Sequence, residues 1–106
     1  MIHRKTLFKK VKAVAHSFDP EARIILFGSR ARGDHRKDSD WDFMVLTEKK
    51  FVWKQEQDFR NKIHYDVELD TETALYTTLE YIKHWEKYKY ADPFLLNITK
   101  EGIEIK

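Results

Sequence analysis

The stretch Gly28–Asp42, which reads GSRARGDHRKDSDWD, joins two apolar segments and carries most of the chemistry of this chain. It begins with a Gly-Ser turn directly after the apolar run at residues 23–27, and it ends with two carboxylates, Asp40 and Asp42. A glycine lets the backbone approach a phosphate closely, and carboxylate oxygens are ligands that Mg²⁺ prefers. The stretch therefore predicts a turn between two strands that holds a nucleoside triphosphate and the metal ions that neutralise it.

Length and composition narrow the class of protein. The chain has 106 residues, which predicts a single domain over residues 1–106, and 42% apolar residues are enough for one modest core. The net charge of +2 does not indicate a strong polyanion binder, and the absence of cysteine excludes disulfides and thiolate metal sites. Because the apolar runs are short and no apolar signal segment follows the basic N-terminus, we expect a cytoplasmic protein without a membrane interaction.

Hydrophobic periodicity predicts an α/β (α+β) fold in which a small mixed sheet is flanked by helices. The expected helices cover residues 3–18, 30–34, 49–62, 72–88 and 93–100, and the expected strands cover residues 23–27, 41–46, 64–69 and 103–105. On the strand at residues 41–46, the alternation of side chains places Asp40 and Asp42 on one face and Trp41 and Phe43 on the other.

Transfer of a nucleotidyl group requires carboxylates on neighbouring strands that face one cleft and hold two divalent cations. Asp40 and Asp42 meet this requirement on the strand at residues 41–46. On the strand expected at residues 64–69, the side chains of Asp66, Glu68 and Asp70 share a face. We choose Asp66 as the third carboxylate, with Glu68 and Asp70 as alternatives.

The Gly-Ser turn supplies the donors for phosphate. Exposed backbone amides at a turn or helix start bind phosphate oxygens, and the Ser29 hydroxyl adds another donor next to Gly28. Arg30 and Arg32 follow directly, and either side chain is a candidate phosphate contact or an ordinary surface residue. The predicted nucleotide-binding residues are therefore Gly28, Ser29, Arg30 and Arg32.

The complete pattern resembles the signature of minimal nucleotidyltransferase domains of the DNA polymerase β superfamily. The resemblance rests on Gly28-Ser29 after a strand, on Asp40-Trp41-Asp42, on Asp66 and on the ending NITKEGI at residues 97–103. Such domains are similar to the catalytic core of kanamycin-type nucleotidyltransferases. The resemblance implies a nucleotidyltransferase fold, two Mg²⁺ ions and ATP or another nucleoside triphosphate as the donor. By position, Ser29 matches the phosphate-binding serine, and Asp40, Asp42 and Asp66 match the metal-binding and catalytic carboxylates.

The same resemblance implies a partner. Domains of this kind pair with a small helical HEPN-type protein as the antitoxin of a toxin–antitoxin module, and some adenylylate a tyrosine of that partner. We therefore expect a Mg²⁺-dependent nucleotidyltransferase that transfers AMP from ATP to a hydroxyl, with such a tyrosine as a candidate acceptor. The alternative is a non-catalytic antitoxin that neutralises a helical partner by contact. Nucleic-acid binding is a more distant alternative, and a homo-oligomer remains open.

Overall fold

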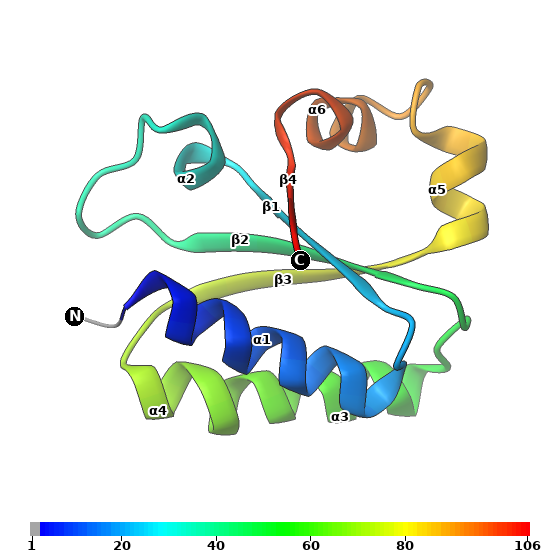
Figure 1. Cartoon of the computed structure of the whole chain (residues 1–106). Helices are drawn as coiled ribbons and strands as arrows, with labels where there is room; N and C mark the ends of the chain where they lie inside the picture. Colours follow the sequence, from blue (N-terminus) through cyan, green and yellow to red (C-terminus); the bar gives the residue numbers. More distant parts are fainter. Residues whose placement is uncertain (1–2) are drawn as a thin grey trace.

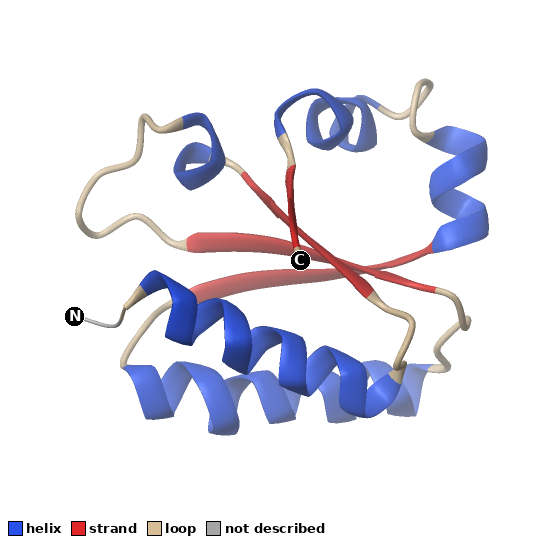
Figure 2. Ribbon diagram, in the orientation of Figure 1, coloured by secondary structure: helices blue, strands red, loops and turns tan. Residues whose placement is uncertain are grey.

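A computed structural model describes residues 3–106 and shows a four-stranded sheet with helices on both faces (Figures 1 and 2). The strand order is β3-β2-β1-β4. β1 (Arg23–Phe27) pairs antiparallel with β2 (Trp41–Thr47) and with β4 (Ile103–Ile105), whereas β3 (Leu75–Tyr81) runs parallel to β2. The expected small mixed sheet flanked by helices is confirmed.

One face of the sheet is covered by long helices. α1 (Arg4–Phe18) and α3 (Trp53–Ile63) lie side by side beneath the sheet in Figure 1. α1 buries Leu7, Val11 and Val14, which recur at helical spacing, while its lysines remain on the other side. These residues form one core cluster with the inward-facing side chains of β1, β2 and α3.

The other face carries shorter helices. α2 (Ser29–Arg32), α5 (Ile82–Tyr88) and α6 (Pro93–Glu101) lie above the sheet in Figure 1. The Asp92 side chain accepts hydrogen bonds from the Phe94 and Leu95 amides, and Pro93 occupies the first turn, as the Asp-Pro pair predicts. A second core cluster joins α5 and α6 to the sheet; it contains Ile25, Phe27, Met44, Leu46, Trp85, Leu95 and Ile98.

The strand expected at residues 64–69 is wrong. α3 continues instead through a π-helical segment, η1 (His64–Glu68), into the short helix α4 (Leu69–Thr71). Tyr65 and Leu69, which a strand would place on the same face as Val67, are exposed. The buried positions Phe59, Ile63 and Val67 are four residues apart, which is the spacing of one helix face.

The helix expected at residues 72–88 is a strand followed by a shorter helix. Glu72 ends α4 in the left-handed conformation, with φ 51°, and β3 begins at Leu75. The sequence LYTTLEY is rich in aromatic and β-branched residues, which favour a strand. Leu75 and Leu79 pack in the core beside α1, so their spacing of four residues fits a strand as well as a helix.

The structure also bears on membrane association. Among the helices of residues 3–106, none combines the length and the apolar composition that are needed to cross a bilayer.

Candidate active site

The Gly-Ser turn lies against the carboxylate of Asp42. Gly28 follows β1 with φ 75° and ψ −161°, a conformation that favours glycine, and a Cβ atom here would lie 2.1 Å from Asp42 Oδ2. The Gly28 carbonyl accepts hydrogen bonds from the Ala31 and Arg32 amides and so begins α2. The Ser29 and Arg30 amides precede these donors and have no partner within the helix. The turn therefore offers backbone donors beside Asp42.

Asp40 and Asp42 form a pair of like charges where β2 begins. Asp42 aligns with Phe27, the residue before the Gly-Ser turn, and the alternation of β2 directs Asp40 to the same side. The pKa of the Asp42 carboxyl is raised by burial and by the neighbouring charges of Asp40 and Glu101, and Arg32 partly opposes this shift. Two carboxylates held together in this way favour a bound cation.

The two arginines of the turn diverge. The Arg32 guanidinium donates from Nε to Asp34 at 3.1 Å and from Nη1 to Glu101 at 3.1 Å, and its charge acts on Asp42. Arg30 donates instead to the carbonyls of Lys37 and Ser39, at 3.2 and 2.9 Å. The Arg30 side chain therefore holds the loop before β2, and only Arg32 keeps its guanidinium beside the carboxylate pair.

The structure does not bring Asp66 to this site. Asp66 lies on η1, in the helical layer under the opposite face of the sheet, and pairs with Lys62 at 3.3 Å. The choice of Asp66 as a third carboxylate of the cleft is therefore wrong. The two alternatives lie in the same layer, where Glu68 accepts from the Leu75 amide and Asp70 pairs with Lys10.

β3, rather than residues 64–69, is the strand next to β2. Its register places Tyr76 beside Asp42. Tyr76 and Phe94 are each 45% exposed, and both contact the ring of Phe27, with centroid separations of 6.4 and 5.7 Å. An aromatic wall therefore stands beside Asp42 where we had expected a third carboxylate.

The carboxylate pair fits a magnesium site that is completed by a substrate. Among residues 3–106, no group of three or more His, Asp or Glu side chains is arranged to hold a metal ion. Mg²⁺, however, is commonly bound through one or two carboxylates together with waters and substrate phosphates. Asp40 and Asp42 supply these hard oxygen ligands, and burial together with the charge of Asp40 raises the pKa of the Asp42 carboxyl.

Glu101 is a member of the site to which the sequence reasoning gave no role. Its Oε1 accepts a hydrogen bond from the Gly28 amide at 3.1 Å, and its carboxylate pairs with Arg32. The ending NITKEGI contains this residue, but its position becomes visible only when β4 pairs with β1. Tyr76 was missed because its segment was expected to be helical.

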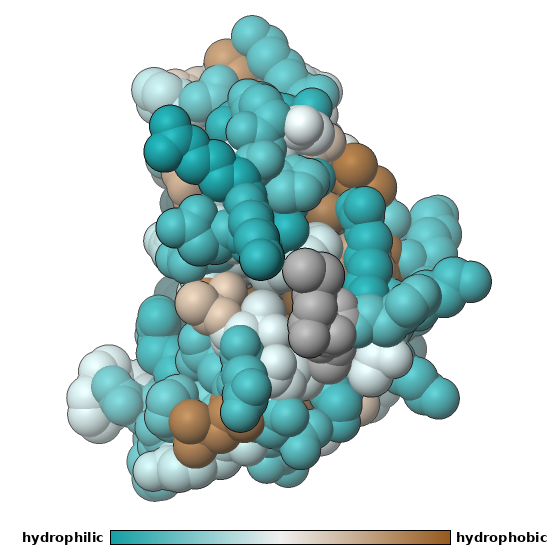
Figure 3. Space-filling model, turned by 90° about the vertical axis from the view of Figure 1, so that its left-hand side faces the viewer, coloured by the Kyte–Doolittle hydropathy of each residue, from teal (hydrophilic) through white to brown (hydrophobic). Residues whose placement is uncertain are grey.

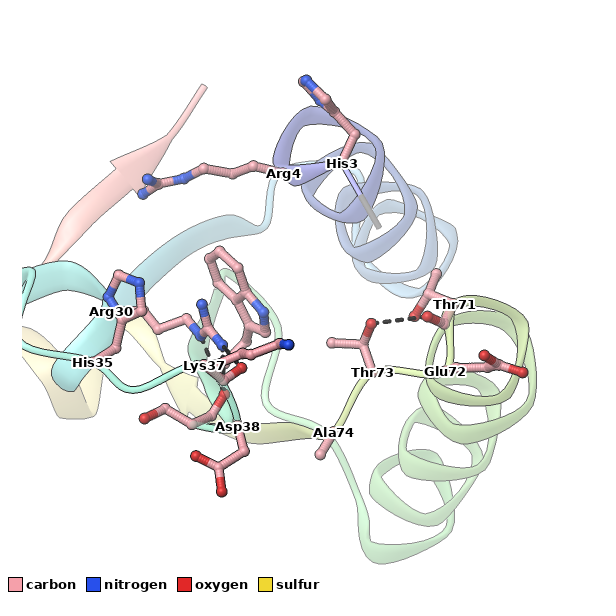
Figure 4. Close-up of a pocket in the computed structure, with 12 residues that line it drawn as sticks. His3, Arg4, Arg30, His35, Lys37, Asp38, Thr71, Glu72, Thr73 and Ala74 are labelled. Atoms are coloured by element: carbon pink, nitrogen blue, oxygen red, sulfur yellow. Dashed lines mark hydrogen bonds between the residues drawn. The ribbon is translucent and has the colours of Figure 1, made fainter. Parts of the chain in front are cut away.

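A cavity of the described part of the chain lies apart from the carboxylate pair. It has a volume of about 890 Å³ and lies between the start of α1, the loop before β2 and the loop after α4 (Figure 4). Arg4, Arg30, Lys37 and Trp41 line it. Trp41 packs with the core beneath the sheet, whereas Asp42 faces the other side. Figure 3 views the molecule from this end, where the surface is mostly hydrophilic.

A Gly-Ser turn that touches an Asp-x-Asp pair on a mixed sheet is the arrangement of a nucleotidyltransferase domain. The family model described as "Polymerase beta, Nucleotidyltransferase" matches residues 9–106, and the chain belongs to this family. Among curated proteins, no sequence matches the chain.

Solved structures of similar fold include toxin–antitoxin complexes. One, described as a toxin–antitoxin with AMP-PNP, has a TM-score of 0.61 at 16% identity over 92% of this chain and 70% of the other. A mutant of the toxin–antitoxin MntA-HpeT with two aspartate-to-glutamate substitutions has a TM-score of 0.59 at the same identity and coverage. A tyrosine-to-alanine mutant of that complex has a TM-score of 0.60 at 16% identity, over 100% of this chain and 73% of the other. At this identity the likeness shows a shared fold.

Proposed function

We propose that this protein is a Mg²⁺-dependent nucleotidyltransferase that transfers AMP from ATP to a hydroxyl, with a tyrosine of a small helical HEPN-type toxin as the acceptor. The observation that carries the proposal is the direct approach of the Gly28 backbone to the Asp42 carboxylate, because it brings a turn with free backbone amides next to a pair of carboxylates. Membership of the nucleotidyltransferase family supports the reaction. The likeness to toxin–antitoxin complexes, one of them with AMP-PNP, supports the donor and the partner.

Each residue of the turn has a distinct task in this proposal. The Ser29 hydroxyl and the Ser29 and Arg30 amides bind phosphate oxygens of the donor, and Arg32 adds a positive charge on the same side. Asp40 and Asp42 would hold two Mg²⁺ ions with the help of substrate oxygens. Ions bound there would neutralise the triphosphate and stabilise the charge that develops on the transferred nucleotidyl group. In the solved MntA-HpeT mutant, glutamate replaces two aspartates, and aspartate is also the residue type to which we assign the metal in this chain.

The acceptor must come largely from another molecule. Transfer requires an attacking hydroxyl in line with the leaving pyrophosphate, and little covalent help from the protein. Asp42 is only partly buried, and the turn and the aromatic wall cover the site from two sides. A partner that closes the remaining side would both deliver the tyrosine and exclude water.

The proposal is tested by a labelling reaction. The purified chain is incubated with ATP labelled at the α-phosphate, with Mg²⁺ and with the helical protein encoded next to it. The wild type should label the partner, Asp42→Asn should not, and Asp66→Asn should label it like the wild type. Equal labelling by the wild type and Asp42→Asn would show that the carboxylate pair is not the catalytic site.

A second candidate is a non-catalytic antitoxin that blocks its partner by contact. It is favoured by the presence of Tyr76, rather than a carboxylate, next to Asp42 on β3. The double variant Asp40→Ala/Asp42→Ala separates the two candidates in a growth assay with the partner. Neutralisation that survives the double substitution supports contact inhibition, and neutralisation that is lost, while complex formation persists, supports transfer.

A further inference from the structure

We propose that Glu101 is a positioning residue that fixes the Arg32 guanidinium and the Gly28 turn for binding of the donor phosphates. This inference rests on the proposed function, because it assigns a role in the same nucleotide site. Glu101 is the last residue of α6, far from the turn in sequence, and it reaches the turn because Ile103 of β4 pairs with Leu26 of β1.

The Glu101 carboxylate bridges the two parts of the turn. Oε1 accepts a hydrogen bond from the Gly28 amide at 3.1 Å, and both carboxylate oxygens accept from Arg32 Nη1, at 3.3 and 3.1 Å. The Glu101 side chain is only 23% exposed. A charged hydrogen bond in a partly enclosed position is stronger than an ordinary surface ion pair. Glu101 therefore ties the backbone and the arginine of the turn to the end of α6.

The bridge leaves Arg32 oriented but still able to donate. A free arginine side chain loses rotamer entropy when it is fixed. Here Asp34 accepts from Nε and Glu101 accepts from Nη1, so the guanidinium plane is already set. Within residues 3–106, Nη2 of Arg32 has no hydrogen-bond partner, in contrast to Nε and Nη1. A preorganised guanidinium with a free donor binds a phosphate oxygen at a lower entropic cost.

A second arginine–glutamate ion pair of the chain does not contact the Gly28 turn, and it serves as a matched control. Arg23 and Glu104 also join the first strand to the C-terminal segment, with a separation of 2.7 Å. Their contact stabilises the pairing of β1 with β4 at the end of β1 that is remote from Gly28. Substitution of Glu104 therefore removes a comparable ion pair and leaves the turn untouched.

The experiment compares Glu101→Ala, Glu101→Gln and Glu104→Ala in the full chain. Calorimetry gives the Kd for ATP with Mg²⁺, steady-state labelling gives KM and kcat, and thermal unfolding gives Tm. We expect Glu101→Ala to raise Kd and KM about tenfold, as for a lost charge-assisted contact, with a much smaller change in kcat. Glu101→Gln keeps an acceptor for the Gly28 amide and should fall between Glu101→Ala and the wild type. Glu104→Ala should bind ATP like the wild type.

A double-mutant cycle tests whether Glu101 acts through Arg32. In the Arg32→Ala background, Glu101→Ala should weaken ATP binding much less than it does in the wild type. Additive effects, an unchanged Kd or tighter binding by both Glu101 variants would overturn the proposal. If Glu101→Ala does not fold, the Kd of Glu101→Gln decides the outcome. Binding of ATP without transfer by the wild type would overturn only the proposed activity, whereas no binding at all would overturn both.

Discussion

The two faces of β2 have unequal cover. Trp41, Phe43 and Val45 point into a core that α1 and α3 cover along the length of the strand. On the other face, Met44 and Leu46 are covered by α5 and α6, but Asp42 lies beyond this second layer. The candidate active site therefore lies at the edge of the second layer of helices, between the Gly-Ser turn and the two ends of α6, which carry Phe94 and Glu101.

This difference separates stability from function along a single strand. On the covered face, neighbouring aromatic rings pack edge to face, with Phe8 at 5.8 Å from both Trp41 and Phe43. On the open face, burial raises the pKa of Asp42 and so disfavours its charged form. Substitutions on the first face should reduce folding, and substitutions on the second should reduce activity.

The largest effect on stability is expected for Phe43→Ala. Phe43 is 0% exposed and lies in the first core cluster, so truncation removes apolar contacts and leaves a cavity. The expected loss is about 3–5 kcal/mol of unfolding free energy, measured by urea denaturation. Phe94→Ala, at a half-exposed ring on the open face, is the matched control and should cost much less. Similar losses for both variants would contradict the unequal cover of the two faces.

Asp42→Asn should have the opposite effect: it should reduce activity strongly and leave the stability of the fold intact. We expect nucleotidyl transfer to fall by at least about a hundredfold, because a preorganised charge at the reacting group is removed. Unfolding free energy should stay the same or rise slightly, because the substitution removes the repulsion with Asp40 and the unfavourable burial of a charge. Labelling assays and urea denaturation of the same preparation measure both quantities. A marked loss of stability would mean that Asp42 supports the fold rather than the reaction.

Gly28→Ala tests the contact between the turn and the carboxylate. The new Cβ would lie 2.1 Å from Asp42 Oδ2, and the positive φ is strained for alanine, so the turn or Asp42 must move. We expect a loss of about 1–3 kcal/mol in stability, together with weaker ATP binding. Gly33→Ala is the control for strain alone, since Gly33 has φ 87° and no atom lies within 4 Å of the position that an alanine methyl group would take there. Equal ATP affinities of the two variants would contradict a role for the close approach.

The part of the site that the sequence predicts is the part built by local structure. A short apolar run followed by Gly28-Ser29, and the alternation that aligns Asp40 with Asp42, require only neighbouring residues. The structure confirms both strands and the helix start after the turn. The chemical roles of these residues remain predictions that the proposed experiments test.

The predictions that were wrong or missing concern segments whose structure depends on contacts between residues distant in sequence. Tyr65, Val67 and Leu69 alternate as in a strand, but the packing of Val67 with α1 and α3 makes the segment helical. Glu101 became part of the site only through the pairing of β4 with β1, which no local pattern indicates.

A smaller, pH-dependent effect is expected at the other end of the open face. Arg23 lowers the pKa of the Glu104 carboxyl by a hydrogen bond and by its charge. This pair therefore adds stability above the unfolded-state pKa of glutamate, near about 4.3, and the contribution disappears as the pH falls through the lower folded-state value. Urea denaturation of the wild type and Glu104→Gln should differ by at most about 1 kcal/mol at pH 7 and should converge in acid. A difference that grows in acid would show the opposite sign of coupling.

The smallest effect is expected for Asp66→Asn, and it is the most direct test of the contrast between the two faces. Asp66 is exposed on η1, and its contact with Lys62 is a surface ion pair within one helix. Such pairs contribute about 0.3–0.5 kcal/mol, so stability should hardly change. Transfer should stay within about twofold of the wild type, because the residue lies in the layer beneath the covered face. If Asp66→Asn instead abolished transfer as Asp42→Asn does, catalysis would involve both faces of the sheet, and the open face alone would not define the site.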